Sequence, residues 1–187
     1  MTEKARAFAI EAHKDTRYGA LSYEYHLQAV VQAMGEAPPE ALAAAWLHDV
    51  VEDTSVTLHD VREAFGGRVA RLVDCVTDEP GENRKARKAG MYKKLATGPV
   101  MARRIKLADR IANMKASNEN PKLGVMYTKE FPEFIRIVGS KSWDRCLRRN
   151  VFFRSSGFLV TQVRKQIREI AFGIRECTFN CTIVFTS

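Results

Sequence analysis

The chain has 187 residues, enough for one domain with a sizeable core and too few for two full catalytic domains. With 45% hydrophobic and 28% charged residues, its composition excludes a disordered chain and a disulfide-framed miniprotein. No run approaches the roughly 18 apolar residues that span a membrane, and the charged start is unlike a signal peptide. We therefore expect a cytoplasmic protein without a membrane partner.

The net charge of +8 is unevenly distributed. Residues 1–140 carry 21 basic and 19 acidic side chains, whereas residues 141–187 carry nine and three. The second part also holds three of the four cysteines, whose irregular spacing matches no zinc pattern, and none of the four histidines. Because the excess charge belongs to this part, we do not expect a nucleic-acid partner for the protein as a whole.

Apolar residues recur at helical spacing through most of the first 138 residues. The polar run 15–22 interrupts this pattern, and the basic segment 79–88 indicates a loop or a solvated helix start. We find neither strand-period alternation nor an internal repeat, so the predicted fold class is all-α, a compact bundle of several helices. The expected helices lie around residues 5–12, 30–34, 39–48, 57–66, 69–76, 101–112 and 134–138.

Particular residues indicate where some of these helices begin and end. Pro38 and Pro39 suit the first turn of the helix that is expected to run into His48. Thr57, with Asp60 three residues later, resembles a capping box, and the glycine pair 66–67 closes that short helix.

The pattern changes near residue 139. An amphipathic helix with a basic polar face is expected over about residues 160–174, and the final run TFNCTIVFTS is β-prone without an evident partner strand. We therefore predict a folded domain over residues 1–139 and a basic C-terminal extension over residues 140–187, to which no role is assigned.

Two adjacent polar residues, His48 and Asp49, follow an apolar run that should be buried. Unpaired charge is costly there, so other groups must pair with them. Neighbours on a helix point about 100° apart. Both side chains can therefore bind one ion only if other elements supply ligands on the opposite side of that ion. The candidates are His26 and Asp109. Two imidazoles and two carboxylates suit Mn²⁺, Fe²⁺ or Zn²⁺ better than Ca²⁺.

A second acidic pair, Glu52 and Asp53, follows four residues after the first pair. If the helix continues, each carboxylate lies one turn beyond a proposed ligand, beside the metal. A bound metal lowers the pKa of a water, and a nearby carboxylate can accept its proton, which indicates hydrolysis. Lys106, Asp109 and Asn113 share a face of a later helix, so a cation and an amide lie beside the site.

A lone His-Asp pair is more often a surface or capping pair than a metal site, so the prediction depends on the combination of motifs. HDVVEDT is followed about 55 residues later by KLADR, and AHKDTRY, Tyr25-His26 and FGGRVARLVDCVTD accompany them. Together they resemble the HD-domain metal-dependent phosphohydrolases, specifically the hydrolase domain of the RelA/SpoT family that degrades (p)ppGpp. The resemblance covers about residues 4–138, and the stand-alone small hydrolases match best in length.

The resemblance implies a reaction and a role for individual residues. The side chains that would bind Mn²⁺ are His26, His48, Asp49 and Asp109. The acids that would position and activate the attacking water are Glu52 and Asp53. Arg17 and Asn113 match positions that contact the nucleotide, and Lys106 lies beside them. The implied reaction is hydrolysis of the 3′-pyrophosphate of (p)ppGpp, a small-molecule partner, without a synthetase activity; the oligomeric state is left open.

The segment Asn83, Arg84, Arg87 and Lys88 resembles a basic segment of the small bacterial members and would meet the substrate phosphates. A solvated, charged helix face explains the same residues equally well. The two remaining histidines are not needed for the site: we expect His13 to face solvent near the polar break and His59 to lie on the surface.

The chain departs from the family pattern in three places. Leu27 stands where proline often follows the first ligand, and Tyr18 stands where a second basic residue often follows Arg17, a position that bears on recognition of the base. The chain from about Gly139 onward matches nothing expected of the family. It is either a lineage-specific extension or the product of a reading-frame change.

Three alternative functions are considered. The same metal and water would serve a deoxynucleotide, a nucleoside monophosphate or NADPH, although many other HD enzymes lack the second acidic pair. A non-catalytic nucleotide-binding module would have been free to lose the ligands that this chain retains. Nucleic-acid binding through the basic extension would depend on salt and would disappear on truncation at residue 140.

Overall fold

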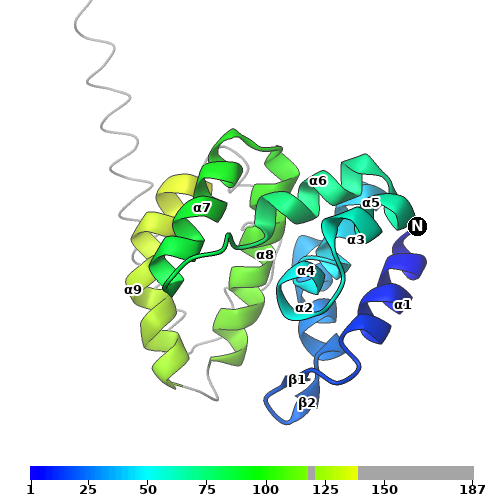
Figure 1. The fold of residues 1–187 in the computed structure, drawn as a ribbon. Coiled ribbons are helices and arrows are strands. Elements are labelled where there is room, and N and C mark those ends of the chain that lie inside the picture. Colours follow the sequence, from blue (N-terminus) through cyan, green and yellow to red (C-terminus); the bar gives the residue numbers. More distant parts are fainter. Residues whose placement is uncertain (118–120, 139–187) are drawn as a thin grey trace, which may run out of the picture.

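The computed structural model describes residues 1–117 and 121–138. Helices make up most of this part (Figure 1), which confirms the predicted all-α class. In chain order they are α1 (Thr2–Ala12), α2 (Glu24–Met34), α3 (Pro39–Trp46), α4 (Val50–Asp53), α5 (Leu58–Phe65), α6 (Gly67–Val76), α7 (Arg84–Thr97), α8 (Val100–Ala116) and α9 (Pro121–Val138). The helix expected at residues 160–174 and the β-prone C-terminal run lie outside the described residues.

Helix α3 lies within the core and packs against α1, α2, α6 and α8. It begins at Pro39, as predicted, where the missing N–H of proline has no helical partner to lose. Its alanines at positions 41, 43, 44 and 45 are at most 1% exposed. Small side chains on several faces let the surrounding helices approach closely.

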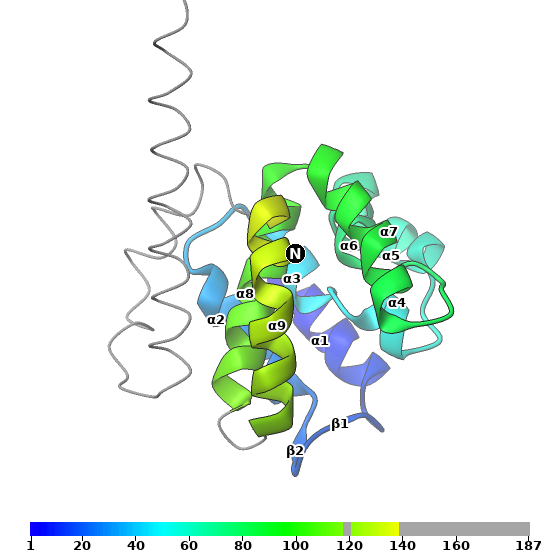
Figure 2. The ribbon, with the colours of Figure 1, turned by 90° about the vertical axis from the view of Figure 1, so that its left-hand side faces the viewer.

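Helix α8 is buried along residues 105–112 because α2, α3, α6 and α9 pack around it. It runs beside α9 in Figures 1 and 2. Three charged residues lie in this buried stretch, namely Lys106, Asp109 and Arg110. Because buried charges must be paired, partners for these residues have to come from the neighbouring elements.

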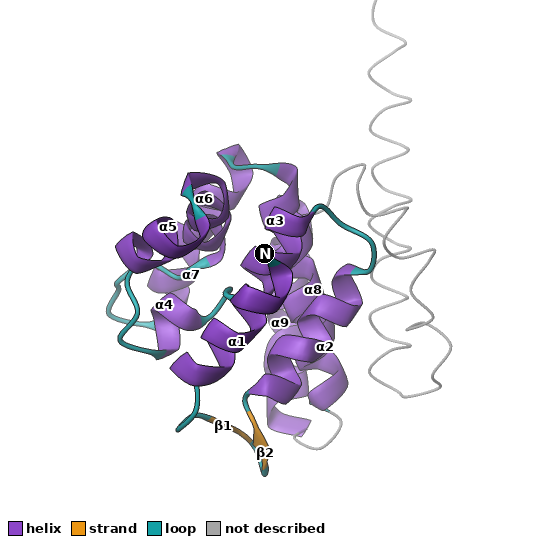
Figure 3. Ribbon diagram, turned by 90° about the vertical axis from the view of Figure 1, so that its right-hand side faces the viewer, coloured by secondary structure: helices purple, strands orange, loops and turns teal. Residues whose placement is uncertain are grey.

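A short hairpin lies within the predicted polar break, where we expected no strand. Strands β1 (Arg17–Tyr18) and β2 (Leu21–Ser22) pair antiparallel, and Gly19 enters the turn with a positive φ of 62°. Figure 3 draws the hairpin in orange at the lower end of the molecule, near the start of α2. Two-residue strands contain too few positions for alternation to be recognised, so the pattern could not predict them.

The basic segment 79–88 is a loop only as far as Asn83. Helix α7 begins at the next residue and extends to Thr97, and Met91 lies on its buried face. The capping box at the start of α5 is confirmed, with the Thr57 and Asp60 side chains each accepting from the other residue's backbone N–H.

None of the described helices is both long and apolar enough for a membrane span.

Candidate metal centre

The centre is built at an interruption between α3 and α4, so the prediction of a continuous helix through His48 is wrong. Helix α3 ends at Trp46, a turn occupies residues 47–49, and α4 begins at Val50. In an unbroken helix His48 and Asp49 would point about 100° apart. The turn directs both side chains into the same space, with His48 Nε2 only 2.9 Å from Asp49 Oδ2.

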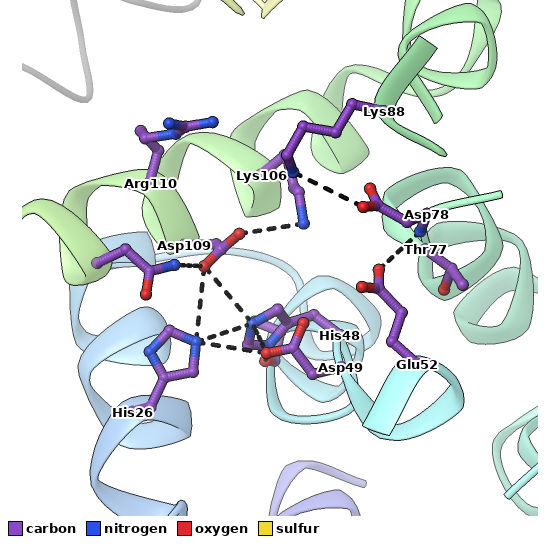
Figure 4. A network of polar contacts seen from close by, with 12 residues as sticks. His26, His48, Asp49, Glu52, Thr77, Asp78, Lys88, Lys106, Asp109 and Arg110 are labelled. Atoms are coloured by element: carbon purple, nitrogen blue, oxygen red, sulfur yellow. Dashed lines mark hydrogen bonds and ion pairs between the residues drawn. The ribbon is translucent and has the colours of Figure 1, made fainter. Parts of the chain in front are cut away.

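The four predicted ligands converge from α2, the 47–49 turn and α8 (Figure 4). His26 Nε2 lies 3.2 Å from His48 Nε2, 3.4 Å from Asp49 Oδ2 and 3.5 Å from Asp109 Oδ1. His48 Nε2 lies 3.9 Å from the same oxygen of Asp109. Each of these side chains is at most 12% exposed. The structure therefore brings together the four residues that the sequence selected.

The chemistry of these donors fits a bound cation. The Nδ1 of His48 lies 2.9 Å from the carbonyl of Ala45 and donates to it, so Nε2 is the atom that faces the carboxylates. Lone pairs this close repel one another unless a proton or a cation lies among them. Burial lowers the pKa of His48, but Asp49 and Asp109 outweigh it and raise this pKa to about 9. A divalent cation bound by this set would displace that proton.

A buried lysine compensates the charge of the ligand on α8. Lys106 is 8% exposed, and its Nζ lies 3.1 Å from Asp109 Oδ2. Burial lowers the pKa of this lysine, but Asp109 and Glu52 raise it above its usual value, so the side chain stays charged. Burial alone would raise the pKa of Asp109, yet Lys106 and His48 hold it below its usual value. Asp109 is therefore an ionised acceptor.

The second acidic pair lies within the single turn of α4 rather than one turn along a continuous helix. Glu52 accepts a hydrogen bond of 2.7 Å from the backbone N–H of Asp78 (Figure 4). Asp53 accepts one of 3.0 Å from the hydroxyl of Tyr23. Burial is the largest cause that raises the pKa of each acid, and the charge of Asp49 adds to it. Both residues are still exposed to solvent, and the raised pKa makes each carboxylate a better proton acceptor than an acid with an ordinary pKa.

The predicted substrate-binding residues have different surroundings. Asn83 caps α7, because its Oδ1 accepts from the backbone N–H of Ala86 at 3.0 Å. Arg84 is paired with Glu130, 2.7 Å away. Arg17 and Arg87 are exposed, and neither makes an ion pair within residues 1–117 and 121–138. Asn113 lies inside the centre, where its Nδ2 donates to Asp109 Oδ1.

Sequence reasoning missed a tyrosine that contacts the centre. The hydroxyl of Tyr23 lies 2.6 Å from Asp49 Oδ2 and 3.0 Å from Asp53 Oδ2, so its single proton is shared between the two carboxylates. The motif comparison singled out Tyr25 instead, which is 61% exposed. Tyr23 precedes His26 by three residues, which places it on the same face of the helical turn, and this spacing was the available signal.

The expectation that His13 faces solvent is wrong. This residue is 2% exposed, and its ring stacks on that of Tyr23 with centroids 4.6 Å apart. Its Nδ1 lies 2.9 Å from the carbonyl of Ala9, one helical turn earlier. The imidazole of His13 therefore packs against the ring of Tyr23, the tyrosine that contacts the centre. His59 is exposed, as predicted.

Comparisons with known proteins point to one family. This chain is 40% identical over 83 residues to guanosine-3′,5′-bis(diphosphate) 3′-pyrophosphohydrolase MESH1 of Drosophila melanogaster, covering 44% of this chain and 46% of that protein. It is 35% identical over 119 residues to guanosine-3′,5′-bis(diphosphate) 3′-pyrophosphohydrolase of Aquifex aeolicus (strain VF5), covering 60% of this chain and 17% of that protein. The matched part thus spans less than half the length of either relative.

A solved structure described as "A metazoan ortholog of SpoT hydrolyzes ppGpp and plays a role in starvation responses" shares the fold. It superposes with a TM-score of 0.64 at 23% identity, covering 90% of this chain and 94% of that chain. The family model described as HD domain matches residues 4–130. The chain therefore belongs to the HD-domain family.

Proposed function

We propose that this chain is a metal-dependent hydrolase that removes the 3′-pyrophosphate of ppGpp and pppGpp, giving GDP or GTP and pyrophosphate. The observation that carries the proposal is the convergence of two imidazoles and two carboxylates in a buried site, with a second acidic pair beside them. The names of the relatives support this nucleotide as the substrate. The mixed nitrogen and oxygen donors suit Mn²⁺, Fe²⁺ or Zn²⁺, and the family resemblance favours Mn²⁺ among them.

The metal, held by His26, His48, Asp49 and Asp109, would supply a Lewis acid for the phosphoryl group and a lowered pKa for the attacking water. Glu52 is the proposed acceptor of the water's proton, since burial raises its pKa and the N–H of Asp78 fixes its orientation. Asp53 would help to orient the water from the side of Tyr23.

The charged groups around the centre would bind the substrate. Lys106 lies beside Asp109 and would stabilise negative charge that develops on the pyrophosphate. Arg17 and Arg87 are exposed and would meet the outer phosphates. Asn113 would contact the nucleotide with the hydrogen-bonding capacity that its contact to Asp109 leaves. Asn83 caps α7 and Arg84 is its first residue, about one turn before Arg87, and both would join it in binding the phosphates.

Product analysis tests this proposal. Purified protein is incubated with ppGpp and Mn²⁺, with Asp49→Ala as the matched control. We expect GDP and pyrophosphate from the wild type, and neither metal binding nor turnover from the variant, because Asp49 is a proposed ligand. Turnover by Asp49→Ala would contradict the site. A wild type that binds Mn²⁺ without releasing pyrophosphate would contradict the substrate, and deoxynucleotides and NADPH would be tested next.

A further inference from the structure

Tyr18 lies against two side chains of the metal centre. Its ring stacks on the imidazole of His26, with centroids 4.8 Å apart and planes inclined by 24°. Its hydroxyl lies 3.0 Å from Oδ1 of Asn113. Tyr18 belongs to β1, whereas these two contacts lie on α2 and α8. Tyr18 therefore connects the hairpin to α2 and α8, the two helices that carry the proposed ligands His26 and Asp109.

The direction of each hydrogen bond follows from the atoms that meet. Oδ1 of Asp109, taken here as a metal ligand, accepts from the amide of Asn113. The NH₂ group of Asn113 must therefore face Asp109, which leaves the amide oxygen toward Tyr18. An amide oxygen only accepts, so the phenol donates. The result is a one-way chain from the Tyr18 hydroxyl through Asn113 to a metal ligand.

We infer that Tyr18 is a positioning residue of the metal centre. Its hydroxyl fixes the orientation of Asn113 and so holds the Asp109 carboxylate, and its ring fixes the imidazole plane of His26. The inference rests on the proposed function in that it takes these two residues as metal ligands. Groups that orient ligands in this way typically contribute about 10-fold or more to metal affinity.

Two variants separate the contacts. Tyr18→Phe removes the hydroxyl and keeps the ring, so Asn113 loses its donor while His26 stays covered. We expect the dissociation constant of Mn²⁺ for the full chain, measured by titration calorimetry, to rise about 10-fold. The electron paramagnetic resonance spectrum of bound Mn²⁺ should also broaden, because the ligand geometry becomes less uniform. Tyr18→Leu removes both contacts and should weaken binding further.

The matched control is Tyr25→Phe, the same substitution one residue before His26 on a side chain that is 61% exposed. It should leave the Mn²⁺ affinity and spectrum unchanged. Metal-free melting temperatures show whether each variant is folded. Wild-type affinity and spectrum in Tyr18→Phe would overturn the inference, and so would an equal loss in Tyr25→Phe.

The test uses Mn²⁺ alone, so it is independent of turnover. Wild-type protein that binds Mn²⁺ but does not hydrolyse ppGpp would overturn the proposed function, and the affinity of Tyr18→Phe would still decide the role of Tyr18. Wild-type protein that binds no Mn²⁺ would overturn both.

Discussion

The end of α3 determines how His48 presents its ring. The last carbonyls of a helix have no intrahelical partner, and one of them, at Ala45, accepts the proton of His48 Nδ1. This leaves Nε2 toward His26 and the two carboxylates. The interruption of the helix therefore supplies both the acceptor that orients the ring and the turn that brings Asp49 beside it.

Glu52→Gln should keep Mn²⁺ bound and lower kcat by about 10²- to 10⁴-fold. The amide oxygen can still accept from the N–H of Asp78, so the local structure is retained, but the side chain can no longer take a proton. Calorimetry with Mn²⁺ and steady-state kinetics with ppGpp measure the two effects. Glu63→Gln, an exposed position on α5, is the control and should match the wild type. Undiminished kcat in Glu52→Gln would place the proton acceptor elsewhere.

The proposed ligands could be selected from the sequence, whereas their tyrosine neighbours could not. His48, Asp49 and Asp109 occur in apolar surroundings, where a charged residue requires a partner, so their types alone indicated a site. Tyr18 and Tyr23 are not marked in this way, since a tyrosine suits a core, a surface or a site equally well. The spacing of Tyr23 from His26 was a weak signal for that residue alone. The direction of each hydroxyl depends on its element, which is a hairpin too short to predict for Tyr18 and the N-cap of α2 for Tyr23.

At the scale of the elements, one carboxylate connects three helices. Glu130 on α9 accepts from Arg84 on α7 at 2.7 Å and from Arg110 on α8 at 3.1 Å. The guanidinium of Arg110 also lies over the rings of Tyr127 and Phe134, 4.6 and 4.7 Å from their centroids. Arg110 follows the proposed ligand Asp109 directly, so this cluster holds the part of α8 that carries Asp109.

Glu130→Gln should lower the free energy of unfolding by about 3 kcal/mol, because Arg110 is 6% exposed and would lose its carboxylate partner. Burial raises the pKa of Glu130, but Arg84 and Arg110 hold it below the usual value of a glutamate. A carboxyl with a lowered folded-state pKa stabilises above its unfolded pKa, and this contribution is lost as the pH falls through the folded value. The difference from the wild type should therefore shrink in acid.

Urea denaturation at neutral pH and near pH 4 measures both effects. The matched control is Glu133→Gln, an exposed position on the same helix, which should change the stability by less than about 0.5 kcal/mol. An equal loss in both variants would assign the effect to helix α9 in general rather than to the cluster.

The boundary between α3 and α4 shows why local patterns locate helices better than their ends. Leu47 and Val50 continue the apolar pattern of α3 and are fully buried, so periodicity predicted one helix. Where the helix ends, His48 and Asp49 pair with residues of α2 and α8, and contacts so distant in sequence leave no trace in the local pattern. By contrast, the start of α5 was predictable because its capping box is formed by residues three apart.

At the scale of the whole molecule, residues 1–140 are nearly neutral, with 21 basic and 19 acidic side chains. Attraction of the proposed anionic substrate would therefore come from the cations around the centre. The HD-domain match ends at residue 130, within the predicted 1–139 domain. The predicted extension at 140–187 lies outside the described residues, and its separation from the domain stays a prediction.

Because the proposed ligands come from α2, the 47–49 turn and α8, a bound metal would cross-link segments that are distant in sequence. Mn²⁺ at 100 times its dissociation constant should stabilise the fold by about 2.7 kcal/mol, since the unfolded chain has no such site. This corresponds to a rise of about 5–10 °C in melting temperature for a chain of this size. Scanning calorimetry of the full chain in Mn²⁺ and in a chelator measures the shift. Glu52→Gln should show the full shift and Asp49→Ala none; a full shift in Asp49→Ala would mean that the stabilising metal binds elsewhere.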